Sequence, residues 1–509
     1  MASPERRAAH LVMIRADAAH WSDPSYRQNI ERLLDRGIGG VGVFLGGLDE
    51  TASMIEDLQR RAGRRLIIAA DYEYGLPMRL DGGIAFPRAM ALGRGLTSTT
   101  ENVASLIAEE ARAIGVHWNW APVADINSNP RNPIVNTRSF GETAELVAEH
   151  AAAYLRGTQS RDVLACVKHV PGHGDTHVDS HRDLPTIELD PQTAHSREFA
   201  PFRHCISQGV RTLMMGHILV PFLDANNPAS LSTAVVTDLV RKQWGFEGLI
   251  TTDALDMGAI TSRYTSAQAA VMAVHAGVDV VLMPDNPDEA IDALALAIAS
   301  GEISEQRLLE SEQRWDAARA FVGVRTASAP KERSRPTETV DQNAHALVAL
   351  RAADAAIHVV GDASLLPITS ATHIAAFAIV DDHSVESATT WFNALAQGAE
   401  VNVDFGYVDM SITDDECASL ADGITGAELV LFGVFGKAVA YRGELGDSQR
   451  LPAVLEMISR GKPSVLVACG SPYGIEPSMA SAMMYTYSDT MPSIAASVLR
   501  LIGRAVPEN

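Results

Sequence analysis

Val163-Leu-Ala-Cys-Val167, followed at once by Lys168-His-Val-Pro-Gly-His-Gly-Asp-Thr-His-Val-Asp-Ser-His181, is the stretch that decides the fold. The apolar run is typical of a buried strand, whereas Pro171, Gly172 and Gly174 oppose a regular helix or a central strand after it. A loop with four histidines, two aspartates and a lysine therefore follows the strand. Barrel enzymes keep their chemistry in such loops at strand ends, so the stretch predicts a barrel.

The histidines of this loop have three interpretations. A solvated polar loop is the simplest, but these residues are reactive types and not the serine and asparagine of ordinary turns. A metal site is the second, because histidines four residues apart can bind zinc from one helix face. The third is acid/base catalysis, in which Asp179 orients His181 and raises its basicity.

We favour the third interpretation and predict no metal, because the proline and glycines of the loop oppose the helix that a metal site would need. His173 and His177 are then expected to shape the loop or to face solvent. The histidines concerned are His169, His173, His177 and His181.

Apolar, β-branched runs alternate with helical patterns through the first 325 residues, which predicts a (β/α)8 barrel over residues 1–325. An incomplete or partly reversed barrel would give nearly the same pattern. The eight candidate strands are Leu11–Ile14, Val41–Leu45, Leu66–Ala70, Trp118–Ile126, Val163–Val167, Arg211–His217, Leu249–Thr252 and Val278–Met283.

Ionisable residues cluster at the carboxyl ends of these runs, the face where a barrel carries its active site. Any one of them could be a carboxylate that caps the next helix, but their recurrence on several strands favours a shared site. These residues are Asp71, Glu73, Asp125, Lys168, His169, His217 and Asp253.

Residues 326–340 lack any periodicity and predict a linker, after which residues 341–509 carry a second series of alternating strands and helices. This pattern predicts a smaller α/β sandwich domain with a mostly parallel sheet. No Gly-x-Gly-x-x-Gly fingerprint opens it, so no dinucleotide is expected and we predict no cofactor.

The composition excludes some classes of partner. A formal net charge of −22 opposes binding to nucleic acid or to an anionic membrane. No apolar run approaches the ~20 residues of a membrane span, and no secretory leader is recognisable, so a cytoplasmic protein is expected. Four scattered cysteines in a chain of 509 residues predict buried thiols. The sequence leaves the oligomeric state open.

The loop motifs, together with the segment around Asp253, resemble glycoside hydrolase family 3 and, within it, the β-N-acetylglucosaminidase branch. The resemblance covers about residues 10–325, and the second domain is similar to the sandwich of two-domain members. The matching segments are Lys168–Gly174, Asp179–His181, Thr252–Met257, Asn136–Gly141, Ala121–Asp125 and Pro228–Ser232.

The resemblance implies a retaining hydrolase that releases terminal β-linked N-acetylglucosamine from oligosaccharides or cell-wall fragments, as in peptidoglycan recycling. Asp253 would attack the anomeric carbon, and His181 with Asp179 would be the acid/base pair. Asp256 is a rival nucleophile by type, but Asp253 lies nearer the strand end. The substrate-binding residues implied are Asp71, Arg79, Asp125, Arg138, Lys168, His169, His217 and Met257.

One motif departs from the family pattern Asp-x-Glu-Gly-Gly-Arg-Val-x-Arg. Here the segment is Asp71-Tyr-Glu-Tyr-Gly-Leu-Pro-Met-Arg79, in which Tyr74 replaces a glycine and the first arginine is lost. Tyr74 in place of glycine is expected to add an aromatic side chain near the pocket rim. The departure leaves open whether Arg79 reaches the substrate.

Four other functions stay open at this point. Glu444 of the second domain could be the acid/base, as in two-domain glucosidases and xylosidases. Phosphate could replace water in resolving the glycosyl-enzyme, which would make the protein a phosphorylase. The barrel could bind amino sugars or peptidoglycan without turnover, or it could be a metal-dependent hydrolase.

Overall fold

The computed structural model describes residues 3–63, 66–176, 184–323, 340–368, 373–381, 384–398, 402–436 and 450–507. They form two compact units. The first comprises Met1–Ile84, Thr97–Val135 and Ser139–Gln342, and the second comprises Ala85–Leu96, Asn136–Arg138 and Asn343–Asn509. The predicted linker, except Val340, lies outside the described residues, and the predicted domain boundaries stay a prediction.

The first unit is an eight-stranded barrel with strand order β7-β6-β5-β4-β3-β2-β1-β8, and all its neighbouring strands are parallel. A parallel bridge between Thr251 and Val280 joins the two ends of the sheet. The strands are β1 Val12–Ala16, β2 Gly40–Val43, β3 Ile67–Ala70, β4 Trp118–Asn119, β5 Leu164–Val170, β6 Thr212–Met215, β7 Leu249–Thr252 and β8 Val281–Leu282.

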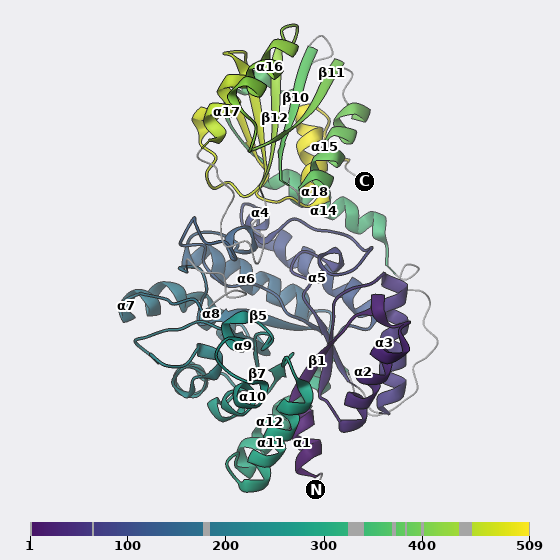
Figure 1. Ribbon diagram of the computed structural model, residues 1–509, viewed down its shortest axis with the longest axis vertical. Coiled ribbons are helices and arrows are strands. Elements are labelled where there is room, and N and C mark those ends of the chain that lie inside the picture. The colour runs from purple at the N-terminus through teal and green to yellow at the C-terminus, as the bar shows by residue number, and fades with distance from the viewer. Residues whose placement is uncertain are drawn as a thin grey trace. The chain divides into compact units, whose positions relative to one another are not determined.

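Each strand is followed by one or more helical segments before the next strand begins (Figure 1). The main ones are α2 Pro24–Arg36, α3 Leu48–Ala62, α5 Thr97–Ile114, α6 Ala144–Gln159, α8 Ala200–Ser207, the π-helix η6 Ala234–Gln243, α10 Ser266–Ala276, α11 Pro287–Ser300 and α12 Glu305–Phe321; α1 Pro4–His10 precedes β1.

Local sequence signals set the ends of these helices. Asp23 caps α2 by accepting a bond from the Ser25 amide, Pro24 begins the helix, and Gly37 ends it with φ at 107°. Thr265 and Gln268 form a capping box at the start of α10. The barrel fold predicted from the sequence is therefore confirmed, with helices that begin and end where their capping residues stand.

Seven of the eight predicted barrel strands differ from the observed ones in their bounds, and the fourth and fifth differ next to the predicted site residues. The fourth was expected over Trp118–Ile126, but β4 pairs only at Trp118–Asn119 and then by one bridge from Val123 to Lys168. Pro122 interrupts the ladder because it has no amide donor. The fifth was expected to end at Val167, but β5 continues to Val170. Lys168 and His169 are thus strand residues, and the turn begins at Pro171.

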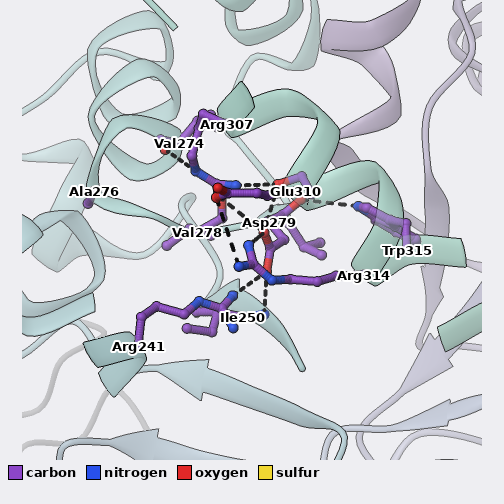
Figure 2. Close-up of polar contacts among 12 residues, drawn as sticks. Arg241, Ile250, Val274, Ala276, Val278, Asp279, Arg307, Glu310, Arg314 and Trp315 are labelled. Carbon is purple, nitrogen blue, oxygen red and sulfur yellow. Dashed lines mark hydrogen bonds and ion pairs between the residues drawn. The ribbon is translucent and has the colours of Figure 1, made fainter. Parts of the chain in front are cut away.

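A buried carboxylate braces the amino end of β8 (Figure 2). Asp279 is fully buried and accepts bonds from Arg241, Arg307 and Arg314 at 2.5–3.1 Å. The Ile250 amide also donates to it at 3.0 Å. Burial alone would raise the pKa of Asp279, but the three guanidinium groups hold it below its ordinary value. The cluster therefore joins β7, β8, η6 and α12 at the end of the barrel opposite the strand-end carboxylates.

The second unit has a six-stranded sheet of order β11-β10-β12-β13-β14-β9, in which only β9 is antiparallel to its neighbour. Its elements are β9 His358–Gly361, β10 His373–Val380, β11 Asn402–Asp409, β12 Leu429–Gly436, β13 Ser464–Gly470, β14 Ala482–Tyr485, and helices α4 Ala89–Leu92, α14 Gln342–Ala356, α15 Val385–Gly398, α16 Asp414–Gly423, α17 Leu451–Ser459 and α18 Met491–Leu501.

The sheet of the second unit has an apolar core on each face. Residues of α16 and α17 pack in one core and residues of α15 and α18 in the other, which confirms the predicted α/β sandwich. All four cysteines are buried and free, as the sequence predicts. In the part of the chain that the structure describes, no helix combines the length and apolarity needed to cross a bilayer.

Candidate active site

Parallel strands bring the predicted residues to one edge of the barrel. Asp71 directly follows β3, and Asp253 directly follows β7. Lys168 and His169 are among the last three residues of β5. His217 lies two residues beyond β6. Since all these strands run in the same direction, their carboxyl ends share one face of the barrel.

A buried lysine pairs with two carboxylates at this face. Lys168 is 2% exposed, and its Nζ donates to Asp71 Oδ1 at 2.6 Å and contacts Glu73 Oε1 at 2.9 Å. Arg79 Nη2 donates to the other oxygen of Asp71 at 2.8 Å. Burial would raise the pKa of Asp71, but Lys168 and Arg79 hold it below its usual range. Asp71 is therefore a charged carboxylate held by two cations.

Asp125 organises two histidines below the same face. Its carboxylate is fully buried and accepts a bond from His169 Nδ1 at 2.7 Å. The backbone amide of His173 donates to it at 2.8 Å. Because Nδ1 of His169 carries the proton in the bond to Asp125, Nε2 is the ring nitrogen left for another partner. Asp125 thus orients His169 rather than facing a ligand by itself.

Asp253 is a charged carboxylate near two histidines and a lysine. Its Oδ1 accepts a bond from the Ala254 amide at 2.8 Å. Burial would raise the pKa of Asp253, but His169, His217, this amide and Lys168 hold it below its ordinary value. The side chain is only half-buried. Asp253 is therefore a carboxylate that is ionised at neutral pH.

His217 has a defined tautomer beside Asp253. Its Nε2 lies 2.9 Å from the Ala254 carbonyl oxygen, which accepts but cannot donate, so Nε2 carries a proton. Its Nδ1 lies 2.7 Å from Ser230 Oγ. The segment around Ser230, which the sequence comparison with the family singled out, therefore fixes this histidine.

Asp256 and Met257 follow Asp253 on the same loop. Partial burial and the charge of Asp253 raise the pKa of Asp256, whereas Arg15 opposes the rise. Asp256 is thus harder to ionise than an ordinary aspartate. Met257 is 7% exposed and precedes helix α9 (Gly258–Thr261).

Hydrogen bonds from side chains hold the turn after β5. Asn132 Nδ2 donates to the carbonyl oxygens of His173 at 2.8 Å and Gly174 at 3.0 Å. His173 Nδ1 bonds Thr176 Oγ1 at 2.8 Å. A Cβ on Gly174 would lie 1.5 Å from the Ile126 carbonyl oxygen, so only glycine fits there. This agrees with the expectation that His173 shapes the loop.

Several predicted site residues lie outside the described residues: His177, Asp179, His181 and Glu444. Arg138 lies in the 3-10 helix η3 (Asn136–Arg138), which groups with the second unit, and its substrate contact stays a prediction. No three histidine, cysteine, aspartate or glutamate side chains are arranged to hold a metal ion within the described ranges.

Two residues near the site were not among the predicted ones. Asn132 bonds the turn after β5, and Glu198 is buried beneath that turn. Glu73, which the sequence places at the end of the same strand as Asp71, contacts Lys168. Asn132 and Glu198 have no local signal, because their roles depend on contacts with residues more than 20 positions away.

Comparison with known proteins gives a consistent result. A family model described as the glycosyl hydrolase family 3 N terminal domain matches residues 5–316. A β-hexosaminidase A of Pseudoalteromonas piscicida is 33% identical over 273 residues, which are 48% of this chain and 46% of that protein. A β-N-acetylglucosaminidase/β-glucosidase of Cellulomonas fimi is 32% identical over 314 residues, or 60% of this chain and 55% of its own length. The chain spans about half the length of these curated relatives.

Solved structures share the whole arrangement of elements. A glycoside hydrolase family 3 β-N-acetylglucosaminidase from Paenibacillus sp. str. FPU-7 matches with a TM-score of 0.86 and 28% identity, covering 99% of this chain and 98% of that chain. A β-glucoside phosphorylase matches with a TM-score of 0.84 and 22% identity over 99% of this chain and 92% of its own, which shows a common fold alone. Because the family model covers more than half of the sequence, this chain belongs to glycosyl hydrolase family 3.

Proposed function

We propose that the protein is a retaining, exo-acting glycoside hydrolase that releases terminal β-linked N-acetylglucosamine. The observation that carries the proposal is the environment of Asp253 at the end of β7. A carboxylate kept ionised by two histidines and a lysine, with part of its surface open, is suited to attack an anomeric carbon.

The residues around Asp253 supply the binding chemistry. Lys168 and Asp71 form a charged pair that donates to and accepts from sugar hydroxyl groups, and charge-assisted bonds are stronger than neutral ones. His169, held by Asp125, adds an oriented ring nitrogen. Arg79 keeps Asp71 in place through its bond to the second carboxylate oxygen.

The acid/base step is assigned to Asp179 and His181 on the sequence resemblance. Leaving-group departure needs a proton donor, and an imidazole titrates near neutrality without the raised pKa that a carboxylic acid would need. The same histidine then removes a proton from water to resolve the glycosyl-enzyme.

The preference for N-acetylglucosamine has support from the relatives. Two curated relatives carry the name β-hexosaminidase, and the Paenibacillus structure is of a β-N-acetylglucosaminidase. The Cellulomonas fimi relative is named for β-glucosidase activity as well. The sugar preference of this chain must therefore be measured directly.

Kinetics on a matched pair of aryl glycosides test the proposal. We expect kcat/KM for the aryl N-acetyl-β-glucosaminide to exceed that for the aryl β-glucoside, with the first product formed as the β-anomer by NMR. A preference for the plain glucoside would contradict the branch assignment, and an α-product would contradict retention.

Four further measurements separate the other functions. Phosphate stimulation with release of a sugar 1-phosphate would indicate phosphorolysis, and loss of activity with a chelator would indicate a metal hydrolase. Glu444→Ala should leave turnover of the aryl glycoside in place, whereas His181→Ala should abolish it; the reverse would place the acid/base in the second domain. Binding of N-acetylglucosamine without any hydrolysis would indicate a binding protein.

A further inference from the structure

A buried glutamate lies beneath the turn that follows β5. Glu198, at the end of η4 (Ala194–Glu198), is 1% exposed. Its Oε1 accepts bonds from Arg197 Nε at 2.6 Å and Ser128 Oγ at 3.3 Å. Its Oε2 is buried without a hydrogen-bond partner among the residues that the structure describes. A buried carboxylate oxygen left unpaired is costly, so its presence calls for a role.

Glu198 is connected to both ends of the turn. Arg197 Nη2 donates to Asp175 Oδ2 at 2.6 Å, so one guanidinium bridges Glu198 and Asp175. At the other end, a Cβ built on Gly172 would lie 3.3 Å from Glu198 Cβ and 3.4 Å from its Oε2. Gly172 has φ at 135°, which favours glycine. The carboxyl group therefore contacts the turn at Gly172 and holds Asp175 through Arg197.

Three charged groups from the surrounding elements face Glu198: Arg197 on η4, Asp175 in the turn, and Asp125 after β4. Burial raises the pKa of Glu198 to about 7, the Arg197 guanidinium opposes the rise, and the charges of Asp175 and Asp125 add to it. The carboxyl group therefore changes charge in the range where enzymes work.

We propose that Glu198 is a positioning residue for the turn that follows β5, and that its ionisation tightens the Arg197 bridge to Asp175. The turn is connected to His169 through Asp125, because the His173 amide of the turn and His169 Nδ1 both bond the Asp125 carboxylate. A change in the turn can therefore alter the position of His169. This inference rests on the proposed function only for its effect on sugar binding. The ionisation of Glu198 is independent of that function.

The first test is Glu198→Gln, which keeps the shape and the Arg197 bond but stays neutral. In the wild type, we expect KM for the aryl N-acetyl-β-glucosaminide to fall about fivefold as pH rises through 7, the difference between a charge-assisted and a neutral bond. In the variant the KM profile should be flat across this range, with kcat little changed. Identical pH profiles for KM in the two proteins would overturn the proposal.

Arg197→Gln tests the bridge itself. Because this change removes the guanidinium that joins Glu198 to Asp175, the fall in KM near pH 7 should disappear, as in Glu198→Gln. A fall in KM that persists at the same pH and size contradicts the bridge. Glu101→Gln is the matched control, because Glu101 pairs with Arg156 at 2.9 Å on an exposed helix surface. Its KM profile should follow the wild type.

Thermal unfolding separates this inference from the proposed function. A carboxyl group whose pKa is raised by folding binds its proton more tightly in the native state, so its contribution to stability is lost as pH rises from about 4.5 through 7. The difference in Tm, Glu198→Gln minus wild type, should therefore become more positive as pH rises from 5 to 8. If neither protein hydrolyses glycosides, this difference still tests Glu198, and a difference that does not change with pH rejects its ionisation.

Discussion

Asp253 and Asp256 are three residues apart, yet the fold gives them opposite electrostatic environments. Asp253 is kept ionised by His169, His217 and Lys168, whereas Asp256 is made harder to ionise by partial burial and by Asp253 itself. Two carboxylates with diverging pKa values at one site are the usual mark of divided roles. At the residue scale, the difference identifies Asp253 as the nucleophile to test.

Asp253→Asn should lower kcat for the aryl N-acetyl-β-glucosaminide by at least about 10⁴-fold, since an amide cannot form the glycosyl-enzyme. Asp256→Asn is the control and should keep kcat within about tenfold, a change of about 1.4 kcal/mol. Steady-state kinetics at neutral pH measure both. Equal losses in the two variants would contradict the assignment.

Lys168→Met should destabilise the protein by roughly 3–5 kcal/mol at neutral pH. The change removes the buried cation that pairs with the carboxylates of Asp71 and Glu73. The pKa of Asp71 is depressed in the fold, so its contribution to stability is present above the unfolded pKa and lost as pH falls. The difference in free energy of unfolding between wild type and variant should thus be largest near pH 7 and shrink toward pH 3.

Urea unfolding at several pH values measures this difference. Lys242→Met is a suitable control, since Lys242 pairs with Asp238 on the exposed surface at 2.8 Å. That change should cost less than about 1 kcal/mol at every pH. A loss for Lys168→Met that does not depend on pH would show that packing, and not charge, is responsible.

At the scale of elements, the two ends of the barrel use buried charge differently. The carboxyl end brings Lys168, Asp71 and Asp253 together at one face of the barrel. The amino end of β8 instead encloses Asp279 among three arginines and a backbone amide, with no exposed side-chain surface on the carboxylate (Figure 2). The first arrangement is the proposed active site, and the second joins η6, β8 and α12.

Asp279→Ala should lower the free energy of unfolding by roughly 3–5 kcal/mol, because three largely buried guanidinium groups lose their shared partner. Since the cluster lies at the other end of the strands, kcat per folded molecule should stay unchanged. Denaturant unfolding and kinetics on the same preparation measure both. Asp238→Ala, which removes an exposed pair, should cost less than about 1 kcal/mol. Equal stability losses in the two variants would argue against a stabilising role for the cluster around Asp279.

At the scale of the whole molecule, the chain crosses between its two units more than once. Ala85–Leu96 lies early in the sequence but packs with the second unit. Met90 and Ala91 are buried in one of its two cores, and Arg88 pairs with Asp489. The two units are therefore not separable by a single cut, although the sequence predicts one linker.

A fragment of residues 1–325 should consequently be less stable than the full chain. Removing the second domain exposes Met90, whose burial is worth about 2 kcal/mol, and leaves Arg88 without Asp489. Calorimetry should show a lower Tm for the fragment than for the first transition of the full chain. Met90→Ser in the fragment should reduce its binding of a hydrophobic dye. A fragment that melts like the full chain would contradict this prediction.

Strand periodicity was sufficient to predict both folds, because a buried parallel strand needs a short apolar run and the chain offers one at each position. The limits of β4 and β5 were harder to predict. Pro122 shortens the pairing of β4, while His169 and Val170 extend β5 although a proline follows them. Strand ends depend on which amides find partners across the sheet, and this information is not local.

Sequence by itself determined the alternation of strands and helices, the placement of ionisable residues at strand ends, and the motifs of the family. These depend on residue type and spacing, which the chain carries directly. Tertiary structure alone decided that Lys168 pairs with Asp71, 97 positions away. It also decided that His169 and His217 lower the pKa of Asp253, and that Glu198 lies beneath the turn after β5. Electrostatic and packing energies depend on distance in space, and only the closed barrel sets those distances.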